Sequence, residues 1–290
     1  MVYPQPLNKK YSLELNSESR FASGNNDQKT EAYSPTSGQY DQMVASLTNL
    51  FDQRITVNNP GFQISYNYKK LKYNFGSGIG FTHFNLSDQT LDKDYLRTYT
   101  NFFPSASVTY TYKSNHTFSF YYIGNTTQPR IDQLQLFRDN NDFFNQYLGN
   151  PLLKPSFRNN FNISNQTYDF IKDVFMYQSL NFSQTSNAIT NSRIINAATG
   201  KTISQPVNTN GNYNFSFYGG FGMKLKKLDL RFELGPNARY NHSTEVINGV
   251  NNTSKNLNAG VSLYLTKAKD KKYDFTVSNS FSFNSNTTQQ

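Results

Sequence analysis

The stretch from Tyr213 to Leu225 reads YNFSFYGGFGMKL, and large apolar side chains occupy nearly every second position. Small or polar side chains fill the positions between them, with Tyr218 as the one aromatic exception. Successive side chains of a β-strand point to opposite faces, so this stretch predicts an amphipathic strand. Its apolar face is formed by Tyr213, Phe215, Phe217, Phe221, Met223 and Leu225.

The same alternation recurs along the whole chain, for example from Leu257 to Leu265 and from Phe275 to Phe283. No segment of useful length shows helical periodicity, so the sequence predicts an all-β protein. About eleven strands are expected, at residues 9–19, 58–69, 71–86, 102–112, 116–128, 157–170, 174–196, 202–225, 228–246, 253–267 and 273–287.

The connections between these strands alternate in size. One set is tight and rich in lysine, as at Lys69–Lys70 and Lys226–Lys227. The other set is mostly longer and polar, at 20–57, 87–101 and 129–156, with shorter members at 197–201 and 247–252. Short turns at one end and long loops at the other are typical of an antiparallel, up-and-down transmembrane β-barrel. Fourteen of the 19 lysines lie in or beside the short turns, where they can reach lipid headgroups.

Composition narrows the class of protein further. The chain has 290 residues, a net charge of +9, 39 Asn, 25 Phe, 21 Tyr and no Cys. Without Cys there is no disulfide scaffold, thiol nucleophile or Cys-ligated metal. No window approaches the roughly 20 apolar residues of a membrane helix, so membrane contact has to be made by strands of a closed barrel.

A soluble β-sandwich with one wet face is the main alternative, since alternation describes it equally well. Sandwich strands average roughly 5–6 residues, however, whereas several predicted strands here exceed a dozen. A sandwich also has no reason to place its long loops at one end only. The barrel is therefore the favoured fold.

The segment from Asn101 to Asp169 contains an ordered series of motifs. Phe103-Pro104-Ser105 opens one strand, Gln128-Pro129-Arg130 follows the next, and Gly149-Asn150-Pro151-Leu152-Leu153-Lys154-Pro155 closes the loop beyond it. Gly149 permits positive φ, and the prolines favour extended backbone leading into Phe157. This series resembles the C-terminal barrel segment of TonB-dependent receptors, in the outer membrane β-barrel protein family of Gram-negative bacteria. Ser156 departs from the Glu that the family usually has there.

The resemblance implies a barrel of about 22 strands with an N-terminal plug domain and a TonB-contacting segment. Eleven strands are an odd number, unlike bacterial single-chain barrels. The N-terminal MVYPQPLNKKYSLEL also lacks the pattern of a secretory signal. We therefore expect residues 1–290 to be a partial barrel domain, without signal peptide, plug domain or final strands.

The function implied by the resemblance is that of a receptor and transporter in the bacterial outer membrane. Its partners would be membrane lipid, the plug, the TonB system and a scarce nutrient, such as a siderophore, an oligosaccharide, a peptide or a cobalamin-like cofactor. The partial barrel alone is not expected to transport. The alternatives are a non-transport surface barrel or adhesin, and a soluble β-sandwich that binds carbohydrate.

Other chemistries have little support in the sequence. His83, His116 and His242 are scattered without a second ligand at diagnostic spacing, so no metal or cofactor is predicted. The lysines gather at turns rather than on one aromatic-bearing face, which argues against nucleic acid. No catalytic motif is present, and we expect that the chain is not an enzyme.

Two groups of residues are candidates for function. The 129–156 loop would be extracellular, and its polar residues could contact a ligand or only order the loop. Asp229, Arg231 and Glu233 alternate with apolar residues and are expected to face the barrel lumen; a catalytic carboxylate pair is the alternative. Gly76, Gly78 and Gly80 would let another group, such as a plug, approach the lumen wall. The candidate ligand contacts in the loop are Arg130, Asp132, Arg138, Asp139, Asn140 and Asp142.

Overall fold

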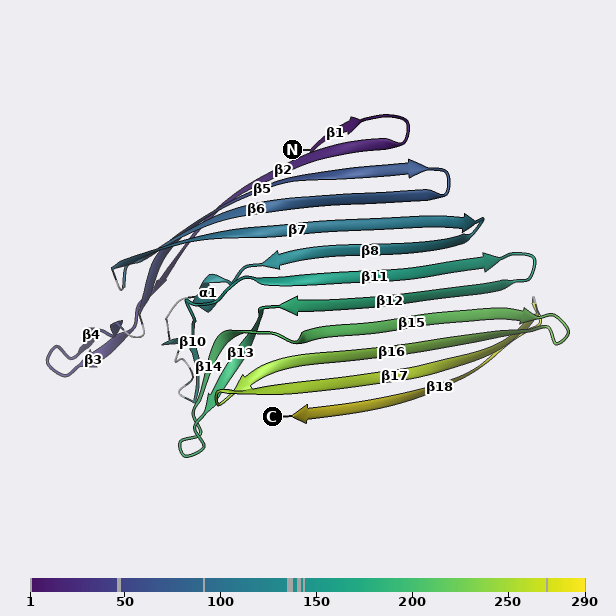
Figure 1. The fold of residues 1–290 in the computed structure, drawn as a ribbon. Coiled ribbons are helices and arrows are strands. Elements are labelled where there is room, and N and C mark those ends of the chain that lie inside the picture. Colours follow the sequence, from purple (N-terminus) through teal and green to yellow (C-terminus); the bar gives the residue numbers. More distant parts are fainter. Residues whose placement is uncertain are drawn as a thin grey trace.

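The chain forms one large, twisted sheet of mostly antiparallel strands, as shown by a computed structural model (Figure 1). The structure describes residues 2–45, 48–90, 92–134, 138–139, 142, 144–269 and 271–289. Within these residues there is a 16-stranded sheet, a separate two-stranded hairpin and the short helix α1 (Ile131–Leu134). None of the described helical residues belongs to a helix long and apolar enough to cross a membrane.

The strands mostly follow one another across the sheet in chain order, and their bounds are as follows. They are β1 (Val2–Pro6), β2 (Tyr11–Gln28), β3 (Glu31–Ser34), β4 (Gln39–Met43), β5 (Asn49–Tyr68), β6 (Leu71–Asp88), β7 (Lys93–Lys113), β8 (His116–Thr127), β9 (Arg138–Asp139), β10 (Asn145–Leu148), β11 (Ser156–Asp169), β12 (Val174–Ser186), β13 (Ala188–Ile195), β14 (Thr202–Thr209), β15 (Asn212–Leu225), β16 (Leu230–Ile247), β17 (Val250–Lys269) and β18 (Tyr273–Gln289).

The strand register joins the apolar residues into continuous rows across the sheet. Phe215, for example, lies opposite Phe182 on β12 and Tyr240 on β16. The predicted alternation is therefore confirmed on the apolar face. The complete row is Leu13, Ile64, Phe75, Ala106, Tyr122, Phe161, Phe182, Phe215, Tyr240 and Leu257.

The other face of the sheet is polar, and we call it the polar face. Ser216, next to Phe215 in the chain, lies opposite Asn181 on one side and Arg239 on the other. The corresponding row is Ser12, Ser65, Asn74, Ser107, Tyr121, Asn162, Asn181, Ser216, Arg239, Asn258 and Asn284.

The apolar face is exposed rather than buried in a core. Phe75 is 49% exposed, and Phe281 on β18 is 65% exposed. A soluble sandwich would bury these side chains between two packed sheets, and the described strands form a single sheet plus a hairpin instead. The sandwich alternative is therefore wrong, and the exposed apolar band is the surface that a barrel presents to lipid.

Short turns and long connections lie at opposite ends of the sheet, as predicted (Figure 1). No more than four residues separate the strands at the short-turn end. Beside these turns, Tyr66 stacks on Tyr73 with ring centroids 4.8 Å apart, and the Lys10 ammonium lies 4.1 Å from the Tyr68 ring centroid. Aromatic rings bordered by lysine are the arrangement expected at the membrane–water interface.

Several predicted strands and loops have different bounds in the structure. The loop predicted at 87–101 is mostly strand, because β7 begins at Lys93. Its polar residues lack an apolar alternation, although the backbone still pairs with β6. The strand predicted at 174–196 is interrupted by Asn187, whose φ of 50° ends β12. The strand predicted at 202–225 is interrupted in the same way by Gly211, with φ 87°.

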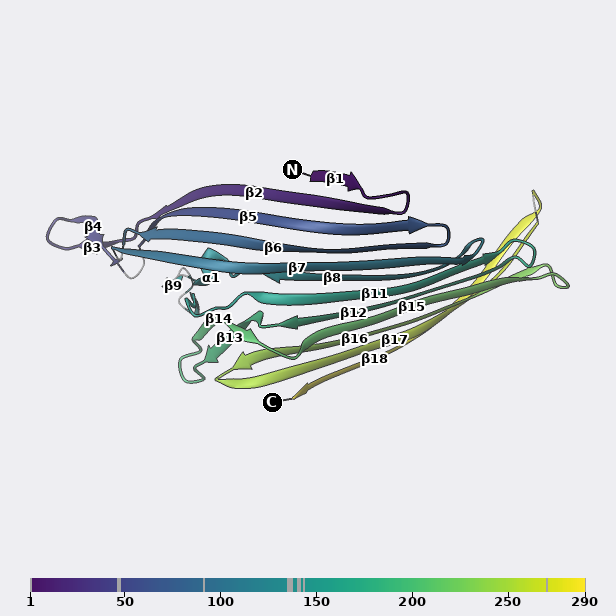
Figure 2. The same ribbon diagram turned by 45° about the horizontal axis from the view of Figure 1, so that its top comes forward.

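The sheet is curved and twisted but does not close on itself. In Figure 2, strands β15 to β18 run at an angle to β2 to β7, as expected of a twisted sheet. Among the described strands, β1 pairs only with β2, and β18 pairs only with β17. The two termini lie at opposite edges of the sheet (Figure 1).

Candidate functional site: a pocket among the long loops

The connection between β8 and β11 folds against the hairpin formed by β13 and β14 (Figure 1). Asn208 on β14 accepts a hydrogen bond from the Lys154 backbone N–H at 2.8 Å and donates to the Lys154 carbonyl at 2.9 Å. Its amide also reaches the Asn187 carbonyl at 2.8 Å. One asparagine side chain thus joins two long connections of the chain.

The 149–155 part of the predicted family motif lies where these connections meet. Gly149 accepts a hydrogen bond from Gln205 at 3.2 Å, and the Asn150 amide donates to the Pro206 carbonyl at 2.9 Å. Arg97, from β7, donates to the Pro151 carbonyl at 3.1 Å. The motif therefore holds the 128–155 connection in place, and Pro129 and Leu153 are buried within it.

The same connection covers the polar face of β6 at the end of the sheet where the long loops lie. Leu134 and Pro151 line a small cavity of about 30 Å³ together with Phe84 and Leu86 of β6. Phe84, Leu86 and Leu134 are all buried. Ser156, at the position where the family usually has Glu, is also buried, and its hydroxyl donates to the Thr127 carbonyl at 3.3 Å.

Phe103 and Pro104 of the family motif pack against glycines on opposite faces. A Cβ placed on Gly80 would lie 2.9 Å from the Phe103 ring, and one on Gly78 would lie 3.6 Å from it. On the apolar face, Pro104 lies over Gly124. At Gly78 and Gly80 the close approach is therefore made by Phe103 of the neighbouring strand, whereas a Cβ on Gly76 would meet the Phe62 carbonyl of β5 at 2.8 Å.

A pocket of about 480 Å³ lies between this loop region and strands β13 and β16. Polar side chains predominate in its lining, with Ile189 as an apolar exception. The lining residues are Arg130, Asp132, Gln133, Tyr147, Ile189, Thr190, Asn191, Ser243, Thr244 and Glu245. We call this the loop pocket.

Two ion pairs organise the charges at the loop pocket. Arg130 forms a bidentate pair with Asp132, with Nε–Oδ1 at 3.1 Å and NH2–Oδ2 at 2.8 Å. The hydrogen bond and charge of Asp132 raise the pKa of Arg130. Arg193 pairs with Glu245 at 2.8 Å. The pKa of the Tyr147 phenol is raised, mainly by burial and further by Asp132, which keeps it a neutral hydrogen-bonding group.

The predicted loop residues divide into three groups. Arg130 and Asp132 line the loop pocket. Asp142 accepts hydrogen bonds from the backbone N–H groups of Phe144 and Asn145 at 2.8 and 3.2 Å and from the Asn145 side-chain amide at 2.7 Å. Its pKa is lowered by these bonds, the Asn145 side chain first, so it orders the loop.

The remaining predicted residues are Arg138, Asp139 and Asn140. Arg138 and Asp139 form β9, whose backbone pairs with β10. Asn140 lies outside the described residues.

Several lining residues were missed by the sequence analysis. Thr190, Asn191 and Glu245 belong to strands that pair in parallel, β13 with β16 at Ser192–Val246 and Arg193–Ile247. Parallel contact between segments about 50 residues apart leaves no local pattern in the sequence.

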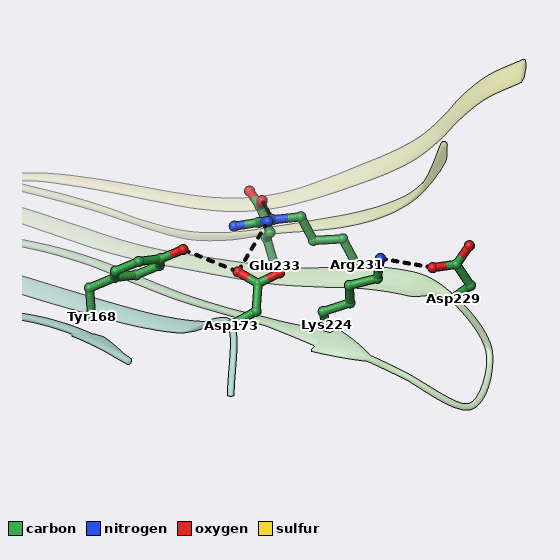
Figure 3. A network of polar contacts seen from close by, with 6 residues as sticks. All are labelled: Tyr168, Asp173, Lys224, Asp229, Arg231 and Glu233. Carbon is green, nitrogen blue, oxygen red and sulfur yellow. Dashed lines mark hydrogen bonds and ion pairs between the residues drawn. The ribbon is translucent and has the colours of Figure 1, made fainter. Parts of the chain in front are cut away.

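The charges predicted to face the lumen form a network at the short-turn end (Figure 3). Arg231 pairs with Glu233 at 2.8 Å and with Asp173 at 3.6 Å, and Tyr168 donates to the same Asp173 carboxylate at 3.4 Å. Nearby, Lys224 pairs with Asp229 at 2.8 Å.

Glu233 and Arg231 lie on β16, opposite Gly222 and Lys224 on the polar face. Asp229 precedes β16 and lies in the turn, with φ 48°. Every charged group of the network has a partner within it, and the pairs link two turns, which favours a structural role over the catalytic alternative.

An antiparallel sheet with an exposed apolar band, an aromatic border with lysines and long loops at one end defines an outer-membrane β-barrel protein. The model of the outer membrane protein beta-barrel family matches residues 1–290, and the chain belongs to this family. It is accordingly a protein of the outer membrane. No curated protein matches the chain.

Solved structures similar to this chain include siderophore receptors. The siderophore receptor PirA from Pseudomonas aeruginosa is 10% identical, with a TM-score of 0.40 over 97% of this chain and 69% of that one. PirA from Acinetobacter baumannii is 12% identical, with a TM-score of 0.40 over 94% and 53%.

A mutant of the ferric enterobactin receptor PfeA from Pseudomonas aeruginosa, in complex with enterobactin, is 9% identical, with a TM-score of 0.40 over 96% and 55%. The chain thus spans about half the length of the last two receptors.

Proposed function

We propose that this chain forms part of an outer-membrane receptor barrel that captures a small ligand among its long loops and admits it along its polar face. The observation that carries the proposal is the loop pocket of about 480 Å³, which combines ion pairs, hydroxyls, amides and a phenol. Ligand sites commonly consist of a concave surface with a few polar groups that fix orientation. The proposed role of the loop pocket is to bind the ligand before it passes through the barrel, and not to catalyse a reaction.

The intact protein is proposed to contain further strands, a plug domain and a segment that contacts the TonB system. Backbone groups in lipid require a closed barrel, because an open sheet edge leaves N–H and C=O groups without partners. Among the described strands β18 pairs only with β17, and its other edge supports closure by further strands of the intact protein. Transport is assigned to that whole protein and not to this chain alone.

The ligand is proposed to be a siderophore, an oligosaccharide, a peptide or a cobalamin-like cofactor. Support for this range comes from the polar lining of the loop pocket, which offers both hydrogen-bond donors and acceptors. Tyr147 provides an amphipathic ring suited to any of these ligands.

The proposal is tested by uptake into cells that express the intact protein. Labelled ferric siderophore, oligosaccharide, peptide and cobalamin probes are supplied with and without a protonophore. We expect one probe class to accumulate only when the proton gradient is present, and Tyr147→Ala to lower that uptake about tenfold through lost ligand contacts. No energy-dependent uptake of any probe, or uptake that is unchanged by Tyr147→Ala, would reject the proposal.

Adhesion is a second candidate function, favoured by the hairpin of β3 and β4, which stands apart from the sheet (Figure 1). The ring centroids of Tyr33 and Tyr40 in this hairpin lie 5.5 Å apart, and the two residues are 53% and 70% exposed. Tyr33→Ala serves as the matched control for Tyr147→Ala, since both remove one tyrosine ring from the long-loop end. Loss of cell adhesion but not of uptake in Tyr33→Ala would assign the hairpin to attachment.

A further inference from the structure

We propose that the polar face carries a second binding surface, for a carboxylate-bearing solute, built on Arg158 and Arg239. This inference rests on the proposed function, because it names the chemistry of a solute that passes along the same barrel wall. The surface lies between the loop pocket at one end and the network of Figure 3 at the other.

An array of asparagines surrounds the two arginines, and we call it the amide wall. Its members are Asn162, Asn181, Asn214, Asn241, Asn256 and Asn258. The register places Arg239 opposite Ser216, which lies opposite Asn181 and then Asn162 on the next strands. The wall therefore extends without interruption from β11 to β17 on one face of the sheet.

Each arginine lines a hollow of its own in this wall. Arg158 contributes to a hollow of about 230 Å³ with Asn162, Asn181 and Asn214. Arg239 contributes to a hollow of about 560 Å³ with Asn241, Asn256 and Asn258, beside Tyr218. Both hollows are large enough for a carboxylate group and the polar atoms next to it.

The two guanidinium groups have no carboxylate partner within the described part of the chain. Arg158 donates to the Ser183 hydroxyl at 3.3 Å, which leaves its positive charge uncompensated. The acidic side chains at the two ends of β16 are already paired, Glu245 with Arg193 and Glu233 with Arg231. The wall between them is therefore cationic, whereas the acidic groups at its ends are paired with basic ones.

The chemistry of this surface selects a polar anion. The planar guanidinium donates two parallel N–H bonds, and this fork matches the two oxygens of a carboxylate. Asparagine amides both donate and accept, so they suit hydroxyl or amide groups next to the carboxylate. A neutral solute would leave both guanidinium charges without compensation and is expected to bind more weakly.

The spacing of the arginines indicates two successive stations rather than one site. Arg239 lies three strands from β11, and its row crosses β11 at Asn162, four residues from Arg158. With about 4.8 Å between strands and about 3.4 Å per residue, the separation is roughly 20 Å. A solute with several carboxylates can therefore release one station while another carboxylate is still held.

Calorimetric titration of the full-length protein in detergent at low ionic strength tests the proposal. The probes are trigalacturonate, with three carboxylates, and maltotriose, a neutral trisaccharide of similar size. We compare Arg158→Gln/Arg239→Gln, Arg158→Lys/Arg239→Lys and the control Arg54→Gln. Arg54 lies ten residues from Ile64 on β5 and so belongs to the apolar side of the sheet.

We expect trigalacturonate to bind more tightly than maltotriose and to weaken about tenfold or more in the double glutamine variant, since charged hydrogen bonds are lost. The double lysine variant should recover part of the affinity, and Arg54→Gln should bind like the wild-type protein. Added salt should weaken trigalacturonate binding only.

Equal affinity for the two probes, or a double glutamine variant that binds trigalacturonate normally, overturns the inference. The arginines would instead contact the plug if the double glutamine variant bound trigalacturonate normally and its plug unfolded at a lower urea concentration. That result also overturns the inference. The proposed function fails separately, through the uptake experiment with Tyr147→Ala. If the double glutamine variant lost trigalacturonate binding but the wild-type protein showed no energy-dependent uptake of any probe, the anion-binding surface would stand and the transport function would fail.

Discussion

Single residues with left-handed backbone shape the turns of this sheet. Asn248 and Gly249 join β16 to β17 with φ values of 50° and 77°. Two successive positive φ values are typical of the type I′ turn, whose twist matches that of the paired strands. The hairpin of β16 and β17, which carries part of the amide wall, depends on this two-residue connection.

Gly249→Ala is expected to destabilise the protein by about 1 kcal/mol, because an L-residue pays for left-handed φ. No atom lies within 4 Å of a Cβ at this position, so the cost comes from the backbone alone. The measurement is the urea midpoint of unfolding in detergent. Gly235→Ala is the control, since its nearest neighbours are 3.8 Å away, and it should be nearly neutral. Equal effects of the two substitutions would contradict the turn assignment.

At the scale of elements, the long connections support one another rather than standing free. The β8–β11 connection contacts β14 through Asn208, β14 pairs with β13, and β13 pairs with β16. The pocket exists only while this series of contacts is intact. A change in one loop should therefore be felt in its neighbours.

Asn208→Ala should loosen the β8–β11 connection by about 2 kcal/mol or more, because it removes three hydrogen bonds and leaves backbone groups of Lys154 and Asn187 unpaired. The expected result is faster protease cleavage within residues 128–155 on intact cells. Asn251→Ala, an exposed asparagine at the start of β17, is the control. Cleavage at the wild-type rate would show that Asn208 does not hold this connection.

At the scale of the whole molecule, the two faces of the sheet face different solvents. Leu180 lies opposite Ile163 and Phe217 on the apolar face, whereas the adjacent Ser179 lies opposite Ser164 and Tyr218 on the polar face. The same substitution at neighbouring positions should therefore have opposite consequences for membrane assembly.

Leu180→Arg is expected to cost about 2–4 kcal/mol near the middle of the membrane, because it places a charge in hydrocarbon. Ser179→Arg should be tolerated, since the polar face is hydrated. The fraction of the intact protein that resists heat-induced unfolding on a denaturing gel after extraction from the outer membrane measures assembly. If both variants assembled equally well, the assignment of faces would be wrong.

Much of the fold follows from local alternation, and some of the site does as well. The alternating positions of Phe215 and Phe217 identify the apolar face from the sequence alone. Arg130 and Asp132 were predicted as ligand contacts in the loop, and both line the loop pocket. The polar parts of β5 and β7 next to the long loops were not predicted as strands. Their backbones pair although their side chains do not alternate between apolar and polar. Thr190 and Glu245 were missed because their proximity depends on a distant parallel contact.

The sequence by itself determined the all-β class, the two faces of the sheet, the alternation of short turns with long loops and the family. These properties are local, since strand geometry sends adjacent side chains to opposite sides whatever else the chain does. Only the tertiary structure decided the loop pocket, the network around Arg231 and the cationic amide wall. Each depends on which strands become neighbours and in which register, and backbone hydrogen bonds between segments far apart in the chain settle that choice.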